Sequence, residues 1–186
     1  MRVKEISRKE IEARFEEMSD YVRIDYLSSC LKNHLDFDTR KFVLVKLAGL
    51  FEAKGMYHDA ARAMKSASEI NTNVQNKIGD FVKSVELFVR AGDYDMADVI
   101  MKKVLSSVSI PRAREIEGTI KEIYKIQGRA CIQKNRRKQA TLAYERLLEF
   151  NLEEGEKDEI RNKLLELYNQ VGDIAQYNKL KKKLVD

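Results

Sequence analysis

The side chains with the clearest chemical potential in this sequence are lysines and arginines that gather in two clusters. The clusters are Arg136, Arg137 and Lys138 with the flanking Lys134, and Lys179 with residues 181–183 at the C-terminus. Cationic clusters of this kind bind phosphate groups, because each neutralised phosphate releases counterions. The same charges also suit helix ends and solubilise a surface, so two readings of each cluster stay open. The first reading predicts a nucleic-acid patch at residues 136–138.

A second cationic arrangement is the pair Lys125 and Arg129, which are four residues apart. On a helix this spacing places both side chains on one face, where they can hold a carboxylate or a phosphate. The alternative is that both are solvated or pair with Glu122 and other nearby acids. The overall charge decides little, since 35 basic residues are interspersed with 30 acidic ones. A net charge of +5 admits a nucleic-acid partner without requiring one.

Residues that would carry catalysis or bind a metal are isolated along the chain. The two histidines are His34 and His58, and the two cysteines are Cys30 and Cys131. The sequence has no glycine-rich phosphate loop, no nucleophile-elbow motif and no clustered His/Cys pattern. We therefore expect no enzyme activity, no cofactor and no metal, and two reduced thiols in the core.

The elements that position these side chains are predicted to be helices. Only one proline and eight glycines occur in 186 residues, and the chain is rich in Lys, Glu, Leu and Ala. Apolar residues recur at helical spacing, and two capping boxes are predicted, at residues 7–10 and 72–75. Pro111 marks the clearest break between helices. No stretch alternates as a strand would, so the prediction is an all-α chain in one domain, residues 1–186.

Membrane and export signals are not visible. The first 18 residues are charged throughout, and the longest apolar stretch, residues 42–51, is interrupted by Lys46. We therefore expect a cytoplasmic protein without a membrane partner.

An internal repeat gives the organisation of the chain. Segments 50–64 and 87–101 align without gaps, each with a Leu-Phe pair, a glycine, a tyrosine two residues later, an alanine five later and a methionine nine later. A third copy, residues 131–144, has Asn135 in the glycine position, and a weaker fourth, residues 167–184, has Gly172. The positions lie 37, 43 and 37 residues apart, a period typical of stacked helical hairpins.

Each repeated residue has a physical role in such a hairpin. Gly55, Gly92, Asn135 and Gly172 tolerate the left-handed backbone that ends one helix and reverses the chain. The alanines, Ala60, Ala97 and Ala140, are small where two helices cross. The longer step before Asn135 predicts that the helix after Pro111 is about two turns longer than its counterparts.

These turns, Gly55-Met-Tyr-His-Asp-Ala60 and Gly92-Asp-Tyr-Asp-Met-Ala97, resemble those of tetratricopeptide repeats. Gly128 matches the small residue at which the two helices of a repeat touch. The segment LFVRAGDYDMADVI also resembles the degenerate hairpins of coat-type and trafficking α-solenoids. The resemblance implies a right-handed stack of about five hairpins. Four tetratricopeptide-like hairpins would span residues 38–184, and residues 1–35 would form a capping hairpin.

The resemblance also implies a concave groove, lined by the first helix of each hairpin, that holds a peptide. The groove positions are Phe42, Val45, Gly49 and Glu52; Gly79, Val82, Glu86 and Val89; Glu122, Lys125, Arg129 and Ile132; and Glu159, Asn162, Glu166 and Asn169. The five binding candidates are Lys83, Glu86, Lys125, Arg129 and Asn162. The carboxylate clamp of chaperone-binding members is not expected, since Lys83 is the one cation at its five positions.

The function predicted on this basis is a scaffold or adaptor that binds a protein or peptide partner. One alternative is an RNA- or DNA-associated protein that uses the basic turn and the C-terminal tail. Another is a structural subunit of an oligomer, because the apolar ends of a solenoid need covering.

Overall fold

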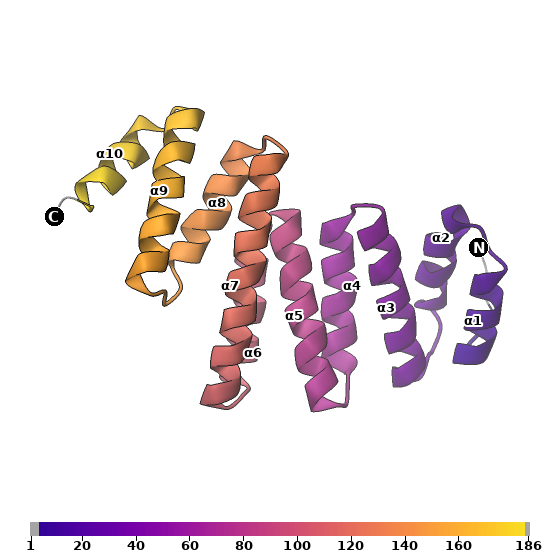
Figure 1. Cartoon of the computed structure of the whole chain (residues 1–186). Coiled ribbons are helices and arrows are strands. Elements are labelled where there is room, and N and C mark those ends of the chain that lie inside the picture. Colours follow the sequence, from indigo (N-terminus) through magenta and orange to yellow (C-terminus); the bar gives the residue numbers. More distant parts are fainter. Residues whose placement is uncertain (1–3, 185–186) are drawn as a thin grey trace. The chain divides into compact units, whose positions relative to one another are not determined.

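The chain is all-α, as predicted. A computed structural model describes residues 4–184, which form ten helices and no strand (Figure 1). The helices divide between two compact units, residues 1–108 and 109–186. The first unit contains α1 (Arg8–Glu16), α2 (Asp20–Cys30), α3 (Phe37–Ala53), α4 (Tyr57–Ile70), α5 (Val74–Ala91) and α6 (Tyr94–Ser106). The second contains α7 (Ile110–Gln133), α8 (Arg137–Leu148), α9 (Glu154–Val171) and α10 (Ile174–Lys182).

In the first unit, each helix packs against its neighbour in the sequence. The pair α1 and α2 also packs on α3, where Ile11, Phe15 and Leu27 are buried against Val43 and Leu47. In the second unit, α7 packs on α8, α8 on α9 and α9 on α10. Within each unit, sequential packing of this kind covers the apolar stripe of a helix with the helix that follows it. The right-handed sense of a stack and the single repeat domain stay predictions.

The four predicted turn residues all have left-handed backbone. The φ angles are 74° at Gly55, 81° at Gly92, 56° at Asn135 and 77° at Gly172. Among the described residues, Asn135 is the one non-glycine with a positive φ. Each of the four residues separates the helices of one pair, so the positions identified by the repeat are confirmed as turns.

The small residues of the repeat lie in the core. The side chains of Ala60, Ala97 and Ala140 are fully buried, each near the start of the second helix of its pair. Helix α7 has 24 residues, whereas α3 has 17 and α5 and α9 have 18 each. The difference of six or seven residues is about two turns, which confirms the prediction for the helix after Pro111.

One capping box is confirmed and the other is wrong. The Ser7 side chain accepts from the Glu10 backbone amide, and the Glu10 carboxylate accepts from the Ser7 amide. Helix α5 is capped by Asn73, which accepts from the Asn76 amide at 3.0 Å, and not by Thr72. The Asn71 side-chain oxygen accepts a hydrogen bond from the Asn73 backbone amide, and the N-cap of α5 therefore lies one residue later than predicted.

None of the helices formed by residues 4–184 is both long enough and apolar enough to cross a membrane.

Candidate functional site

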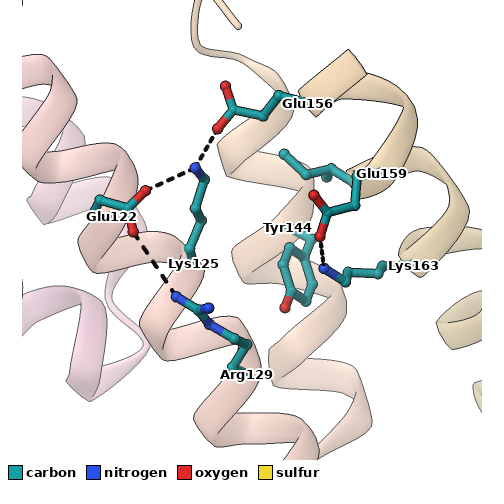
Figure 2. A pocket seen from close by; sticks show the side chains of 8 residues that line it. Glu122, Lys125, Arg129, Tyr144, Glu156, Glu159 and Lys163 are labelled. Carbon is teal, nitrogen blue, oxygen red and sulfur yellow. Dashed lines mark hydrogen bonds and ion pairs between the residues drawn. The ribbon is translucent and has the colours of Figure 1, made fainter. Parts of the chain in front are cut away.

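The candidate site is a hollow of about 230 Å³ in the second unit, between α7 and α9 (Figure 2). Eight residues line it: Glu122, Lys125 and Arg129 from α7, Tyr144 from α8, and Glu156, Glu159, Ile160 and Lys163 from α9. The residues from each of α7 and α9 recur at spacings of three and four, which place them on one face of their helix. The site therefore has charged walls on two helices and an aromatic residue from a third.

Lys125 connects α7 and α9, the two helices that form the charged walls of the site. Its Nζ lies 2.8 Å from Glu122 Oε1 on its own helix and also contacts Glu156 Oε1 on α9 (Figure 2). Hydrogen bonds to Glu122 and then to Glu156 raise the pKa of Lys125 above its ordinary value. The Lys125 ammonium is therefore engaged by two carboxylates.

Arg129 is held much more loosely. Its Nη2 lies 3.9 Å from Glu122 Oε2, at the limit of an ion pair, and its side chain is 59% exposed. A long, exposed pair of this kind contributes little to stability. The Arg129 guanidinium, with several N–H donors in a planar fork, is therefore free to bind an added acceptor.

Lys163 and Glu159 form an ion pair one helical turn apart on α9. The hydrogen bond from Lys163 is the main cause that lowers the pKa of Glu159. Both residues belong to one helix and are partly or fully exposed, so their pairing does not connect α9 to the rest of the unit.

Tyr144 forms the inner part of the site. Its side chain is 2% exposed, and its ring lies over Gly128 of α7, where a Cβ would come 2.7 Å from Tyr144 Cζ. Its hydroxyl has no hydrogen-bond partner among the described residues. In Figure 2 the hydroxyl points to the side of the site where Arg129 and Lys163 lie. Burial raises the pKa of Tyr144, so the hydroxyl keeps its proton and can donate it.

The predicted binding residues of the first unit are paired with one another. Lys83 Nζ lies 3.1 Å from Glu52 Oε1 on α3 and 3.1 Å from Glu86 on α5. Arg90 contacts the same two carboxylates and donates to the Tyr57 hydroxyl at 2.9 Å. This cluster of two acids and two bases satisfies its own charges and joins α3, α4 and α5.

The structure brings only part of the predicted set into one site. Lys125 and Arg129 line the hollow together, whereas Lys83 and Glu86 lie in the other unit. Asn162 is exposed on α9 and does not line the hollow. Val89, also predicted to face the groove, is fully buried.

Sequence reasoning missed several members of both clusters. Glu156 and Lys163 were not among the groove positions, although they follow helical spacing from Glu159. Arg90 was missed as well, and its four-residue spacing from Glu86 is the signal that identifies it. Tyr144, which lines the hollow, is not among the predicted groove positions either.

The basic turn lies elsewhere in the second unit. Arg136, Arg137 and Lys138 are exposed at the turn and first residues of α8. The Arg137 Nε donates to Gln170 Oε1 of α9 at 2.8 Å.

Both cysteines, Cys30 and Cys131, are buried and free. Residues 4–184 contain no group of three or more His, Cys, Asp or Glu that could hold a metal ion.

A scan of the chain against models of known protein families finds no match, and a search of curated proteins finds no significant relative.

Proposed function

We propose that this protein is a scaffold that binds a protein partner, and that the partner contacts the face of α7 and α9 around the hollow. The observation that carries the proposal is that one hollow is lined both by the loosely held Arg129 and by Tyr144, whose hydroxyl has no hydrogen-bond partner among the described residues. Arginine and tyrosine are enriched among the residues that dominate binding energy at protein interfaces. The predicted groove positions Glu122, Lys125, Arg129 and Glu159 meet at this site.

The proposal includes membership of the tetratricopeptide-like α-solenoids. Four left-handed turn residues, at a period of 37 to 43 residues, support it. The buried alanines after three of these turns also support it. In such a protein, the first helix of each hairpin presents residues to a partner, and α7 and α9 are the first helices of their pairs.

The first unit contributes differently under this proposal. Its groove positions Glu52 and Glu86 both form ion pairs with Lys83 and Arg90, so every charge of that cluster has a partner within the cluster. Breaking a satisfied network to bind a partner costs free energy. We therefore assign the cluster around Arg90 to the packing of α3, α4 and α5, and the binding face to the second unit.

The test compares the capture of proteins from a nuclease-treated native lysate by the wild-type chain and by two variants. Arg129→Glu reverses a charge in the hollow. Arg114→Glu is the matched control, because Arg114 is an exposed arginine fifteen residues earlier on the same helix. A partner lost with Arg129→Glu and retained with Arg114→Glu supports the proposal. Equal retention by both variants overturns it.

A second candidate function is binding of RNA or DNA by the basic turn. The observation that favours it is the exposure of Arg136, Arg137 and Lys138 as neighbours. Binding to phosphates would weaken steeply as salt rises. Reversing all three charges would then abolish retention on a nucleic-acid column. The same triple change leaves protein capture intact if the face of α7 and α9 is the binding surface.

A structural role in an oligomer is the third prediction that stays open. Sedimentation velocity of the purified chain tests it, because the oligomer reading requires association without any other partner. We favour the scaffold because the hollow on α7 and α9 offers uncommitted donors.

A further inference from the structure

We propose that the hollow binds the side-chain carboxylate of a glutamate or aspartate of the partner. The carboxylate would accept hydrogen bonds from the Tyr144 hydroxyl and the Arg129 guanidinium and would pair with the Lys163 ammonium. This inference rests on the proposed function and names the chemistry that the site recognises.

Tyr144 provides the first reason. A buried hydroxyl without a partner loses its hydrogen bonds to water and gains none in return, which is uncommon in folded proteins. The side chain is 2% exposed and is held in place by its contact with Gly128. The hydroxyl therefore cannot turn away to a different partner without disturbing the packing of α7 on α8. An acceptor placed in the hollow satisfies it.

The charges around the hydroxyl determine which acceptor fits. Arg129 and Lys163 are the cations on its side of the site (Figure 2). Both favour the ionised form of Tyr144, as positive charges close to the hydroxyl must. An acceptor that touches the hydroxyl is therefore drawn to two positive charges, which selects an anionic oxygen over a neutral carbonyl.

Lys125 does not take part in this recognition. It is already engaged by Glu122 and Glu156, and its pairing joins α7 to α9. Lys163 is different, because its partner Glu159 is exposed on the same helix and can return to water. An incoming carboxylate can replace Glu159 without opening the contact between the two helices.

The acidic residues of the site favour a carboxylate over a phosphate. Three glutamates line the hollow with the three cations, so its formal charge is zero. A phosphate dianion would be repelled by Glu122, Glu156 and Glu159 more strongly than a monoanion. The volume of about 230 Å³ lies below the range of sites for whole small molecules, about 300–1,000 Å³, and suits a single side chain.

The test uses two end-blocked probes, N-acetyl-glutamate amide and N-acetyl-glutamine amide, titrated into the isotope-labelled full chain at low ionic strength. We expect saturable NMR shifts of the Gly128 amide and the Tyr144 ring with the glutamate probe. The glutamine probe should cause shifts at least fivefold smaller, because it lacks the charge. Inorganic phosphate should bind at least threefold more weakly than the glutamate probe. Equal responses to the two end-blocked probes, or tighter binding of phosphate, would overturn the proposal.

The variant Tyr144→Phe separates recognition from packing. It removes the hydroxyl and keeps the ring over Gly128, so the melting temperature should stay the same or rise. Affinity for the glutamate probe should fall at least fivefold. If affinity is unchanged in a folded Tyr144→Phe chain, the hydroxyl does not bind the carboxylate and the proposal fails.

The two experiments distinguish failure of the carboxylate proposal from failure of the proposed function. A partner captured through Arg129, with no response to the glutamate probe, would refute the carboxylate and leave the scaffold standing. A specific response to the probe, without a captured partner, would support the carboxylate site and count against the scaffold.

Discussion

The ring of Tyr144 packs directly against Gly128 at the site. A Cβ atom built on Gly128 would lie 2.7 Å from Cζ and 2.8 Å from one Cε of the Tyr144 ring. The absence of a side chain at position 128 therefore lets the ring lie directly on the backbone of α7. This contact joins α7 to α8 and places the Tyr144 hydroxyl beneath the face that we propose for binding.

Gly128→Ala is expected to destabilise the chain by about 1–3 kcal/mol, because the added methyl group overpacks the contact with Tyr144. Gly118 is the control on the same helix, since a Cβ there meets nothing within 4 Å. Gly118→Ala should stabilise by about 0.5–1 kcal/mol through helix propensity. Urea unfolding measures both changes. Equal effects of the two substitutions would show that the Tyr144 ring is not packed on Gly128.

Ala97→Glu should destabilise strongly, by about 3 kcal/mol or more, because Ala97 is fully buried on α6, which packs on α5. Lys181→Glu should change stability by no more than about 0.5 kcal/mol, because Lys181 is exposed on α10. Thermal unfolding compares the two variants. Similar shifts in melting temperature would mean that the core is placed wrongly.

Asn135→Gly should stabilise the chain by about 0.5–1 kcal/mol. Asn135 has a φ of 56°, a conformation that glycine adopts without the steric cost of a Cβ. The converse change Gly92→Ala, at a φ of 81°, should destabilise by about 1 kcal/mol. Denaturant titrations of the two variants test the turn geometry. Loss of stability with Asn135→Gly, together with a gain of stability with Gly92→Ala, would contradict a left-handed backbone at these positions.

Stability should fall on acidification below about pH 5. Hydrogen bonds lower the pKa of Asp36 and Glu10 at helix starts and of Glu69 and Glu159 beside lysines. The unfolded chain, with ordinary values of 4.5 for Glu and 3.8 for Asp, binds more protons as the pH falls. The favourable charged forms are then lost as the pH falls through the lowered folded pKa values. Urea unfolding from pH 7 to 3 tests this, and stability that rises on acidification would contradict it.

The variant Asp36→Asn tests how much one of these carboxylates contributes to the pH dependence of stability. Asp36 accepts hydrogen bonds from the backbone amide and the hydroxyl of Thr39 at the start of α3. Removing its titration should make the acid limb of the stability profile less steep and leave its direction unchanged. An unchanged slope would mean that this cap does not contribute to the pH dependence.

The helices and turns of the chain could be predicted from local chemistry. A left-handed turn needs Gly or Asn whatever surrounds it, so Gly55, Gly92, Asn135 and Gly172 were identifiable from their spacing alone. The N-cap of α5 could not be placed from the sequence with the same accuracy. Thr72 and Asn73 are both good caps, and the hydrogen bond from the Asn73 amide to Asn71 decides between them.

The candidate site was only partly predictable, because it depends on contacts between helices. Lys125 and Arg129 have the same charge and lie on the same face, yet one is bound by two carboxylates and the other is loosely held. The difference comes from Glu156, which is 31 residues away from Lys125 in the sequence. The unsatisfied hydroxyl of Tyr144 likewise follows from its burial against α7, which helical spacing does not reveal.

Hydrogen exchange of the chain with and without its captured partner tests whether the face of α7 and α9 binds a protein partner. Binding at this face should slow exchange in peptides that cover residues 122–129 and 156–163. Exchange at the basic turn, residues 134–138, should stay unchanged. Protection confined to that turn and to residues 179–183, with unchanged exchange along α7 and α9, would contradict binding at this face.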